Sequence, residues 1–276
     1  MKIEFLGTAA YERIPSMFCN CPICTHARKK SGKDVRTQAQ LLINEDLLID
    51  FGMDNYAHSL KNGVDFCKIQ NLLITHSHED HFIIEELKMR DEMGSKNLIY
   101  KDLKIYGGKG AQELFNTTNP SNCEFILAEM FRTYDVGDYK VTVLPAHHGT
   151  IDPRTYLISD GKSTLYYSLD TGHPDEQTYD FLRRNNIKID AVICDCTYGV
   201  LDITFDGHHM SLLDNISHRQ KLEELGVIKK GIPWVVTHFS HNGLNKDGRA
   251  VTFKEFNKLC KSHGFILSYD GLEITV

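Results

Sequence analysis

The sequence lacks several features that would place it in other classes of protein. No stretch approaches the ~20 consecutive apolar residues that a membrane-spanning helix needs. The N-terminal segment MKIEFLGTAA has no long apolar core of the kind found in signal peptides, and we expect it to form a first strand. No segment rich in Gly, Ser or Pro divides the chain, and there is no repeat. These absences exclude a membrane span and predict a cytoplasmic protein of one domain.

An excess of positive charge is also missing. The 31 Lys and Arg residues are outnumbered by 37 Asp and Glu residues, which gives a formal net charge of −6. This balance argues against a general nucleic-acid coat, although a local basic groove would still be compatible with it. Because 41% of the residues are hydrophobic, a mainly disordered chain is excluded as well.

Short apolar runs predict a chain of strands and helices. The predicted strands are Ile3–Leu6, two strands in Leu41–Asp50 around a turn at Asn44–Asp46, Leu72–Thr75, Val141–Leu144, Thr155–Ile158, Leu165–Leu169, Ala191–Cys194, Trp234–Thr237, and strands near Ile266 and Ile274. The predicted helices are Ile83–Met93, Pro174 to about Arg184, Leu212–Leu225 and Phe253–Cys260. Since strands occur both in hairpin-like pairs and in alternation with helices, we expect mixed sheets covered by helices. One domain would span residues 1–276, with an insert around residues 83–121.

Cysteine and histidine, in contrast, are abundant, with 8 and 14 residues. In a reducing compartment, clustered cysteines indicate a metal site or catalysis more often than disulfides. The positions of these residues therefore decide what they do.

The densest cluster is Thr75-His76-Ser77-His78-Glu79-Asp80-His81, directly after a predicted buried strand. His76 and His78 point the same way if the strand continues, because side chains alternate with period two. Asp80 and His81 can face a second point nearby. Imidazole and carboxylate groups suit zinc, iron and related metals, so the pattern predicts two adjacent metal ions. The alternative, a solvated polar loop, does not explain three histidines and an aspartate within six residues.

This THxHxDH motif resembles the metallo-β-lactamase superfamily of di-metal hydrolases, whose fold is an αββα sandwich of two mixed sheets with outer helices. The resemblance implies further ligands, each at the end of a strand, and candidates follow in the right order: His148 or His147, then Asp170, then His238. By this resemblance one metal ion is bound by His76, His78 and His148, a second by Asp80, His81 and His238, and Asp170 bridges the two. A hydroxide held between the ions would then be the nucleophile.

Two of these positions leave alternatives open. The sequence Pro145-Ala146-His147-His148 offers two histidines, and a Pro-x-x-His pattern in the favoured branch of the family selects His148. Asp50 matches an early aspartate of the family. It would support the histidine loop from behind the ligands, or it is simply an aspartate in a turn.

A second cluster, Cys19-Asn20-Cys21-Pro22-Ile23-Cys24, has the spacing C-x-C-x-x-C. Three thiolates this close suit a tetrahedral structural zinc with one further ligand, while a redox or buried set is the alternative. The cyclic-phosphate phosphodiesterase branch of the superfamily (PhnP-like) has such a cluster, joined by a histidine three residues after the last catalytic one. This similarity implies His241 as the fourth ligand. The remaining cysteines show no ligand spacing and are interpreted as buried or incidental: Cys67, Cys123, Cys194, Cys196 and Cys260.

The resemblance to the PhnP-like branch implies hydrolysis of a small phosphodiester, for which a cyclic phosphate is a candidate. Asp80 and Asp170 would act as catalytic ligands, and His209, at the position of a histidine that is not a ligand, would be a general acid or a hydrogen-bond donor to the phosphate. A surface histidine at a helix start is the alternative for His209. Thr171 and Tyr198 are candidates for lining the pocket.

Other superfamily activities fit the sequence less well. A glyoxalase-II-like thioesterase has Gly-Gly after the motif, where this chain has Phe82-Ile83. A tRNA 3′-processing nuclease carries a Gly- and Lys/Arg-rich arm that we do not find. A relative of pyrroloquinoline quinone biosynthesis protein B has a less complete set of catalytic ligands.

Cofactors and partners are expected from the same resemblance. We expect two catalytic divalent ions (zinc, manganese or iron), one structural zinc and a homodimer. We interpret the stretch His148–Arg154 as longer than in the resembled enzyme and expect it to border the pocket, so the substrate can differ.

Overall fold

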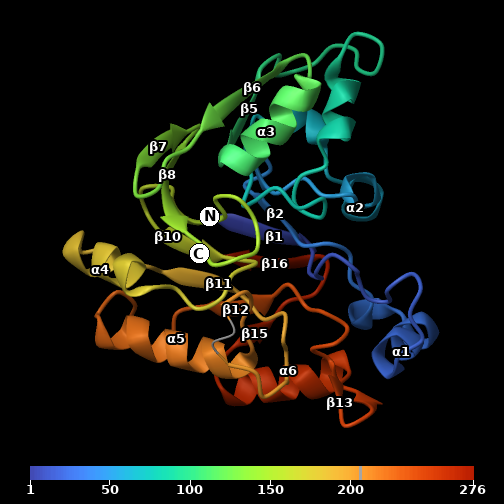
Figure 1. The fold of residues 1–276 in the computed structure, drawn as a ribbon, viewed down its shortest axis with the longest axis vertical. Helices are drawn as coiled ribbons and strands as arrows, with labels where there is room; N and C mark the ends of the chain where they lie inside the picture. The colour runs from blue at the N-terminus through green and yellow to red at the C-terminus, as the bar shows by residue number, and fades with distance from the viewer. Residues whose placement is uncertain (205–206) are drawn as a thin grey trace.

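Two seven-stranded sheets form the centre of the computed structural model, which describes residues 1–204 and 207–276 (Figure 1). The first sheet contains, in spatial order, β16 (Leu272–Thr275), β1 (Lys2–Gly7), β2 (Gln40–Ile43), β3 (Leu47–Ile49), β4 (Asn71–Leu73), β5 (Leu103–Gly107) and β6 (Cys123–Leu127). The second contains β15 (Ile266–Leu267), β12 (Trp234–Thr237), β11 (Ala191–Asp195), β10 (Thr164–Ser168), β9 (Arg154–Ser159), β8 (Tyr139–Pro145) and β7 (Thr133–Val136). A short hairpin, β13 (Asn245–Lys246) with β14 (Arg249–Ala250), lies outside both sheets.

The side chains of successive residues on the central strands point into different apolar layers. On β10, Tyr167 belongs to the layer between the two sheets, while its neighbour Tyr166 packs with the helices outside. The same alternation separates Leu48 from Ile49 on β3, since strand side chains point alternately to opposite faces. Both faces of each sheet are therefore covered, as the predicted αββα sandwich requires, and the fold class is confirmed.

The helices cover the outer faces of the two sheets. α4 (Glu176–Arg184), α5 (Leu212–Glu224) and α6 (Phe253–Ser262) lie together against the second sheet, and α3 (Lys109–Thr118) lies beside β5 and β6 (Figure 1). The remaining helices are α1 (Pro22–Lys30), α2 (Asn55–Asn62) and the 3₁₀ helices η1 (Gly32–Asp34), η2 (Phe66–Lys68) and η3 (Ile84–Arg90). None of the described helices is long and apolar enough to cross a membrane.

Three predicted elements differ in detail from the structure. The segment with helical spacing after the histidine loop is the 3₁₀ helix η3, which buries Ile84 and Leu87 at the three-residue period of that helix type. α4 begins after Asp175, whose side chain accepts a hydrogen bond from the amide of Thr178 and caps the helix, so Pro174 precedes the helix. Residues 83–121, expected as an insert, include β5, which lies between β4 and β6 in the first sheet.

Parallel strands bring several carboxyl ends to one edge of the molecule. β3, β4, β5 and β6 are parallel in the first sheet, as are β10, β11, β12 and β15 in the second. Side chains that follow these strands consequently meet where the two sheets adjoin.

Candidate metal centre

Three polar residues lie within two residues of the end of a strand and have a left-handed backbone conformation. Asp50 follows β3 with φ 66°, Asp170 follows β10 with φ 49°, and His238 follows β12 with φ 64°. Residues other than glycine rarely adopt this conformation, and it persists where surrounding contacts fix it. All three side chains are buried. The strand ends thus hold a rigid polar site between the sheets.

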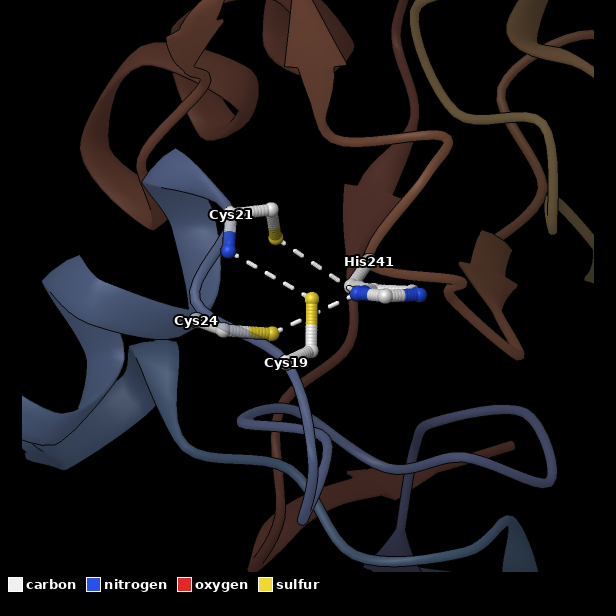
Figure 2. Close-up of side chains that lie close together, drawn as sticks. All are labelled: Cys19, Cys21, Cys24 and His241. Carbon is white, nitrogen blue, oxygen red and sulfur yellow. Dashed lines mark hydrogen bonds between the residues drawn. The ribbon is translucent and has the colours of Figure 1, made fainter.

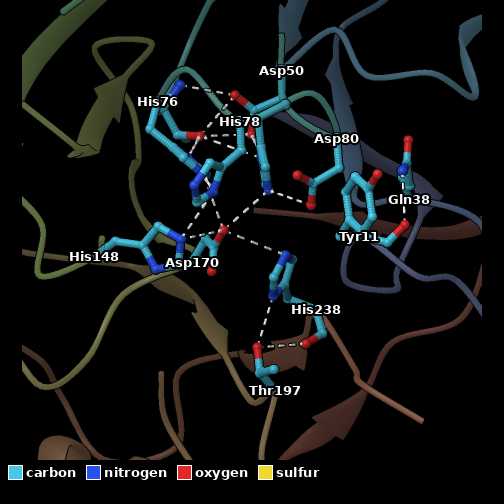
Figure 3. A network of polar contacts seen from close by, with 12 residues as sticks. Tyr11, Gln38, Asp50, His76, His78, Asp80, His148, Asp170, Thr197 and His238 are labelled. Carbon is cyan, nitrogen blue, oxygen red and sulfur yellow. Dashed lines mark hydrogen bonds and ion pairs between the residues drawn. The ribbon is translucent and has the colours of Figure 1, made fainter. Parts of the chain in front are cut away.

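The first group of possible metal ligands comprises His76, His78, His148 and Asp170 (Figure 3). Nε2 of His76 is 2.9 Å from Nδ1 of His78 and 3.2 Å from Oδ2 of Asp170. Nε2 of His148 is 3.4 Å from the same carboxylate oxygen. Ligands at about 2.0 Å from a tetrahedral ion would be ~3.3 Å apart, so these spacings fit one small cation.

A second group comprises Asp80, His81, Asp170 and His238, all of them buried. Nε2 of His81 is 3.2 Å from Oδ2 of both Asp80 and Asp170. Nε2 of His238 is 3.8 Å from Oδ2 of Asp170. The two groups consequently share one carboxylate, which makes Asp170 the candidate bridge.

Several histidines are fixed through their far ring nitrogen. Nδ1 of His81 donates to Oδ2 of Asp50 at 2.7 Å, and Nδ1 of His148 donates to the carbonyl of His208 at 3.3 Å. Nδ1 of His238 is hydrogen-bonded to Oγ1 of Thr197 at 2.7 Å. Such bonds set the tautomer and direct Nε2 into the site, as is usual for metal-binding histidines. Asp50 therefore lies behind the candidate ligand His81 and fixes the orientation of its ring.

Unpaired donor atoms point to the same centre. Nε2 of His81 and Nε2 of His238 are buried, and the carboxylate oxygens 3.2 Å and 3.8 Å away from them do not have the geometry of hydrogen-bond acceptors. Buried polar atoms are normally paired, so an unpaired cluster of imidazole and carboxylate atoms indicates an ion that the protein binds. Burial lowers the pKa of His148 to about 4, which leaves its ring neutral and able to bind a cation at pH 7. The residues present thus fit a pair of divalent ions.

The structure distinguishes His148 from its neighbour His147. The side chain of His147 is 43% exposed and its Nε2 lies 3.8 Å from Oδ2 of Asp175, outside both groups. Thr171, a candidate for the pocket, instead accepts a hydrogen bond from the backbone amide of His147 through Oγ1 and so holds this loop. Tyr198, the other candidate, does line the cavity over the site.

His209 lies against both groups and is bound by two carboxylates. Its Nδ1 is 3.0 Å from Oδ1 of Asp170 and 3.3 Å from Oδ2 of Asp195. Burial opposes a charge on His209, but the two carboxylates outweigh it and raise the pKa of the ring to about 11. His209 lies beside the candidate bridge, and with Asp170, Asp195 and His238 it also forms a third group of possible metal ligands.

Asp195, at the end of β11, is a site residue that the sequence did not reveal. It is fully buried and accepts hydrogen bonds from the amides of Thr197 and Met210. Its Oδ2 also lies 3.4 Å from Nδ1 of His238. Asp195 thereby holds His209 and His238 in place together. Its position after a buried strand, like that of Asp50, is the only signal in the sequence.

The cysteine cluster and His241 form a separate group of possible ligands (Figure 2). Nδ1 of His241 is 3.5 Å from Sγ of Cys21 and 3.4 Å from Sγ of Cys24, and Sγ of Cys19 completes the group. With Zn–S bonds of ~2.3 Å and Zn–N bonds of ~2.0 Å, tetrahedral ligands would be separated by about 3.5 Å. These four residues fit one zinc ion. The other five cysteines belong to no such group among the described residues.

A cavity of about 930 Å³ opens over both groups of the candidate centre. Its walls include His78, Asp80, His148, Asp170, His209 and His238. Residues from the N-terminal loop, including Tyr11 and Glu12, and from the segment Ser240–Asn242 form the rim. The candidate ligands are therefore accessible to a small molecule.

Comparison with known proteins identifies the family. Residues 46–226 match the beta-lactamase superfamily domain. The chain belongs to the metallo-β-lactamase superfamily. Members of this superfamily are metal-dependent hydrolases, and the histidines and aspartates described above are candidate metal ligands within this fold.

Solved structures with the superfamily fold cover nearly the whole chain. A new diphosphatase from the PhnP family has a TM-score of 0.72 at 18% identity, with 99% of this chain and 96% of that chain covered. Zn²⁺-bound PqqB from Methylobacterium extorquens has a TM-score of 0.73 at 17% identity, with both chains fully covered at 100%. The short form of human tRNase Z has a TM-score of 0.64 at 16% identity, covering 100% of this chain and 99% of that chain. At such identities the similarity concerns the fold. No curated protein sequence matches the chain.

Proposed function

We propose that this metallo-β-lactamase-fold hydrolase is a phosphodiesterase that hydrolyses a small phosphodiester. The observation that carries the proposal is the arrangement around Asp170, whose carboxylate is shared by three overlapping groups of possible ligands and lies 3.0 Å from Nδ1 of His209. Two adjacent cations with a nearby proton donor suit a reaction in which a phosphoryl group gains and loses oxygen ligands. The cysteine cluster, which resembles that of the PhnP-like branch, supports the same proposal.

Two divalent ions (zinc, manganese or iron) would be bound at the candidate centre. His76, His78, His148 and Asp170 would bind one, and Asp80, His81, Asp170 and His238 the other. When bound, they would lower the pKa of water and neutralise the phosphoryl oxygens. Cys19, Cys21, Cys24 and His241 would bind a structural zinc. The homodimer and the cytoplasmic location stay predictions.

The chain's own residues would assist departure of the leaving group. In the reaction a bond forms between a water oxygen and phosphorus, and the ester P–O bond breaks to give a phosphomonoester and an alcohol. The leaving oxygen needs a proton, which His209 would donate and later regain from the attacking water. Asp170 and Asp195 hold the imidazolium in position through Nδ1, so His209 is a general acid rather than a metal ligand in this account.

Hydrolysis of bis(p-nitrophenyl) phosphate and of a 2′,3′-cyclic nucleotide, on a sample of measured metal content, tests the proposal. We expect turnover of both esters with about three metal ions per chain, and loss of turnover after chelation. The alternatives predict other substrates: a thioester for a glyoxalase-II-like enzyme and precursor tRNA for a processing nuclease. A fully metal-loaded protein that cleaves either of these and ignores both phosphodiesters would contradict the proposal. No turnover of any of them would favour a biosynthetic relative of PqqB.

A further inference from the structure

The charged side chains around the rim of the cavity indicate which kind of phosphodiester it can bind. The cavity, at about 930 Å³, is much larger than a phosphate group and leaves room for the organic part of a substrate. Among the described residues that line it, none is Lys or Arg. Proteins that bind several phosphates ordinarily supply such cations, because each phosphate needs its own compensating charge or donor.

Two acidic side chains stand on this rim instead. Oε1 of Glu12 accepts hydrogen bonds from Oγ of Ser240 at 2.6 Å and from the amide of His241 at 3.3 Å, so its place is fixed. Glu79 lies within the histidine loop and is exposed. Neither belongs to a group of possible metal ligands among the described residues. Cations that neutralise Asp80 and Asp170 would therefore leave both carboxylates charged, although Oε1 of Glu12 also lies 3.8 Å from Nε2 of His241.

Basic side chains on the neighbouring segments are directed to other carboxylates. Nε of Arg13, the residue after Glu12, is 2.8 Å from Oδ2 of Asp54. Nζ of Lys246, beyond Asn242, is 3.6 Å from Oδ2 of Asp202. Neither lines the cavity. Away from the histidines of the candidate centre, a second phosphate on a substrate would accordingly meet two carboxylates and no Lys or Arg of the described lining.

We infer that the substrate is a phosphodiester with a single negative charge whose remaining part bears no further phosphate, and that Glu12 and Glu79 exclude substrates that carry one. This inference rests on the proposed function. The side chains of Tyr11, Ser240 and Asn242 on the same rim offer an aromatic ring, a hydroxyl and an amide to that neutral part. Repulsion between like charges separated by a few ångströms persists in a partly enclosed site, and salt weakens it.

A matched pair of substrates tests this selectivity. Adenosine 2′,3′-cyclic phosphate and its 5′-phosphorylated form share the reacting group and differ only in the distant charge. We expect kcat/KM of the metal-loaded enzyme to be at least tenfold higher for the form without the 5′-phosphate. Raising the salt concentration should narrow the difference. Equal values, or a preference for the 5′-phosphate, would overturn the inference while leaving the phosphodiesterase proposal in place. If the enzyme hydrolysed neither compound and no other phosphodiester, both the inference and the phosphodiesterase proposal would be overturned.

Variants locate the effect on the rim. Glu12→Gln combined with Glu79→Gln should reduce the selectivity ratio at least threefold, since glutamine keeps the acceptor oxygen of Glu12 but removes the charge. Glu79→Lys, a change at an exposed position, should reduce the ratio by itself and covers the case that the Glu12 variant folds poorly. Glu113→Gln, an exposed change on α3 away from the cavity, is the control and should leave the ratio unchanged. An unchanged ratio in both rim variants would overturn the role of these residues.

Discussion

The two ligand groups of this protein are held in different ways. Those around Asp170 lie at strand ends of both sheets, and hydrogen bonds from residues such as Asp50 and Thr197 fix their rings. The cysteine group joins the start of α1 to the loop after β12, and Cys19 and Cys21 are partly exposed. Its supporting contacts come from loops: Nδ2 of Asn245 donates to Sγ of Cys21 at 3.3 Å, and the amide of Ser16 donates to Sγ of Cys24 at 3.3 Å.

This difference predicts that the group around Asp170 serves catalysis and that the cysteine group serves stability. A centre built into two sheets should keep its shape when its ions leave, because the strands and the supporting bonds remain. A cluster borne by loops should depend on its ion, since metal binding supplies part of the folding free energy of such segments. The two groups adjoin, because His241 follows His238 by three residues and the amide of His241 contacts Glu12 on the cavity rim.

The largest expected effect comes from removing the shared carboxylate. Asp170→Ala should reduce phosphodiester hydrolysis at least about 1,000-fold and lower the catalytic metal content, because both groups lose a ligand. The fold should persist. Kinetics, metal analysis and circular dichroism check these points. Asp202→Ala, the same change at a side chain that is 79% exposed, is the control. Full activity of the Asp170 variant would refute the bridging role.

Removing the proposed general acid should cost less. His209→Gln should lower kcat by about 100- to 1,000-fold, within the usual range for a general acid, without loss of bound metal. The loss should be smaller for p-nitrophenyl esters, whose leaving group needs little protonation, than for a cyclic nucleotide. His147→Gln alters a neighbouring histidine outside both groups and should have little effect. If the His209 variant bound less metal, His209 would instead be identified as a metal ligand.

A change behind the ligands should have an intermediate effect on the same centre. Asp50→Asn removes the negative charge that Nδ1 of His81 contacts at 2.7 Å. Loss of such a partner typically weakens metal binding by about 10- to 100-fold. Activity should therefore fall at limiting metal and recover at high metal concentration. A titration of activity against added metal checks this, and an unchanged titration would contradict a supporting role for Asp50.

Disruption of the cysteine group should affect activity least and stability most. Cys21→Ser should remove one zinc ion per chain and lower Tm by several degrees, at about 2–4 °C per kcal/mol in a chain of this size. The catalytic ligand set should remain. Cys67→Ser changes an exposed cysteine outside every described group and should alter neither zinc content nor Tm. If the two variants behave alike, the structural zinc is wrongly assigned.

Much of this site could be predicted because its ligands follow strands that the sequence makes visible. The buried runs before His76, Asp170 and His238 are short and apolar, and each ends at a polar residue. Two features depend on contacts between distant segments. Asp195 is fourteen residues from His209 in the chain, and only the folded structure brings them within 3.3 Å. The distinction between His147 and His148 depends on the carbonyl of His208, which comes from another loop.

The fold was predictable to a similar degree. The hairpin between β2 and β3 follows from its apolar strands and from Asn44 and Glu45, both with positive φ as a tight hairpin turn requires. The sequences of β5, β6 and β7 show no clear pattern of apolar residues that would predict a strand. β6 and β7 are largely half-exposed or exposed, so they lack a continuous apolar run. Their pairing in the two sheets comes from tertiary contacts.

Reconstitution of the metal-depleted protein tests the central claim most directly. After the ions around Asp170 are removed by a chelator and the zinc of the cysteine group is retained, phosphodiester hydrolysis would be measured against added Mn²⁺ or Zn²⁺. The account predicts no activity at the start and saturation at two equivalents per chain. Activity that survives chelation, or that never depends on added metal, would contradict a catalytic pair of ions bound at Asp170.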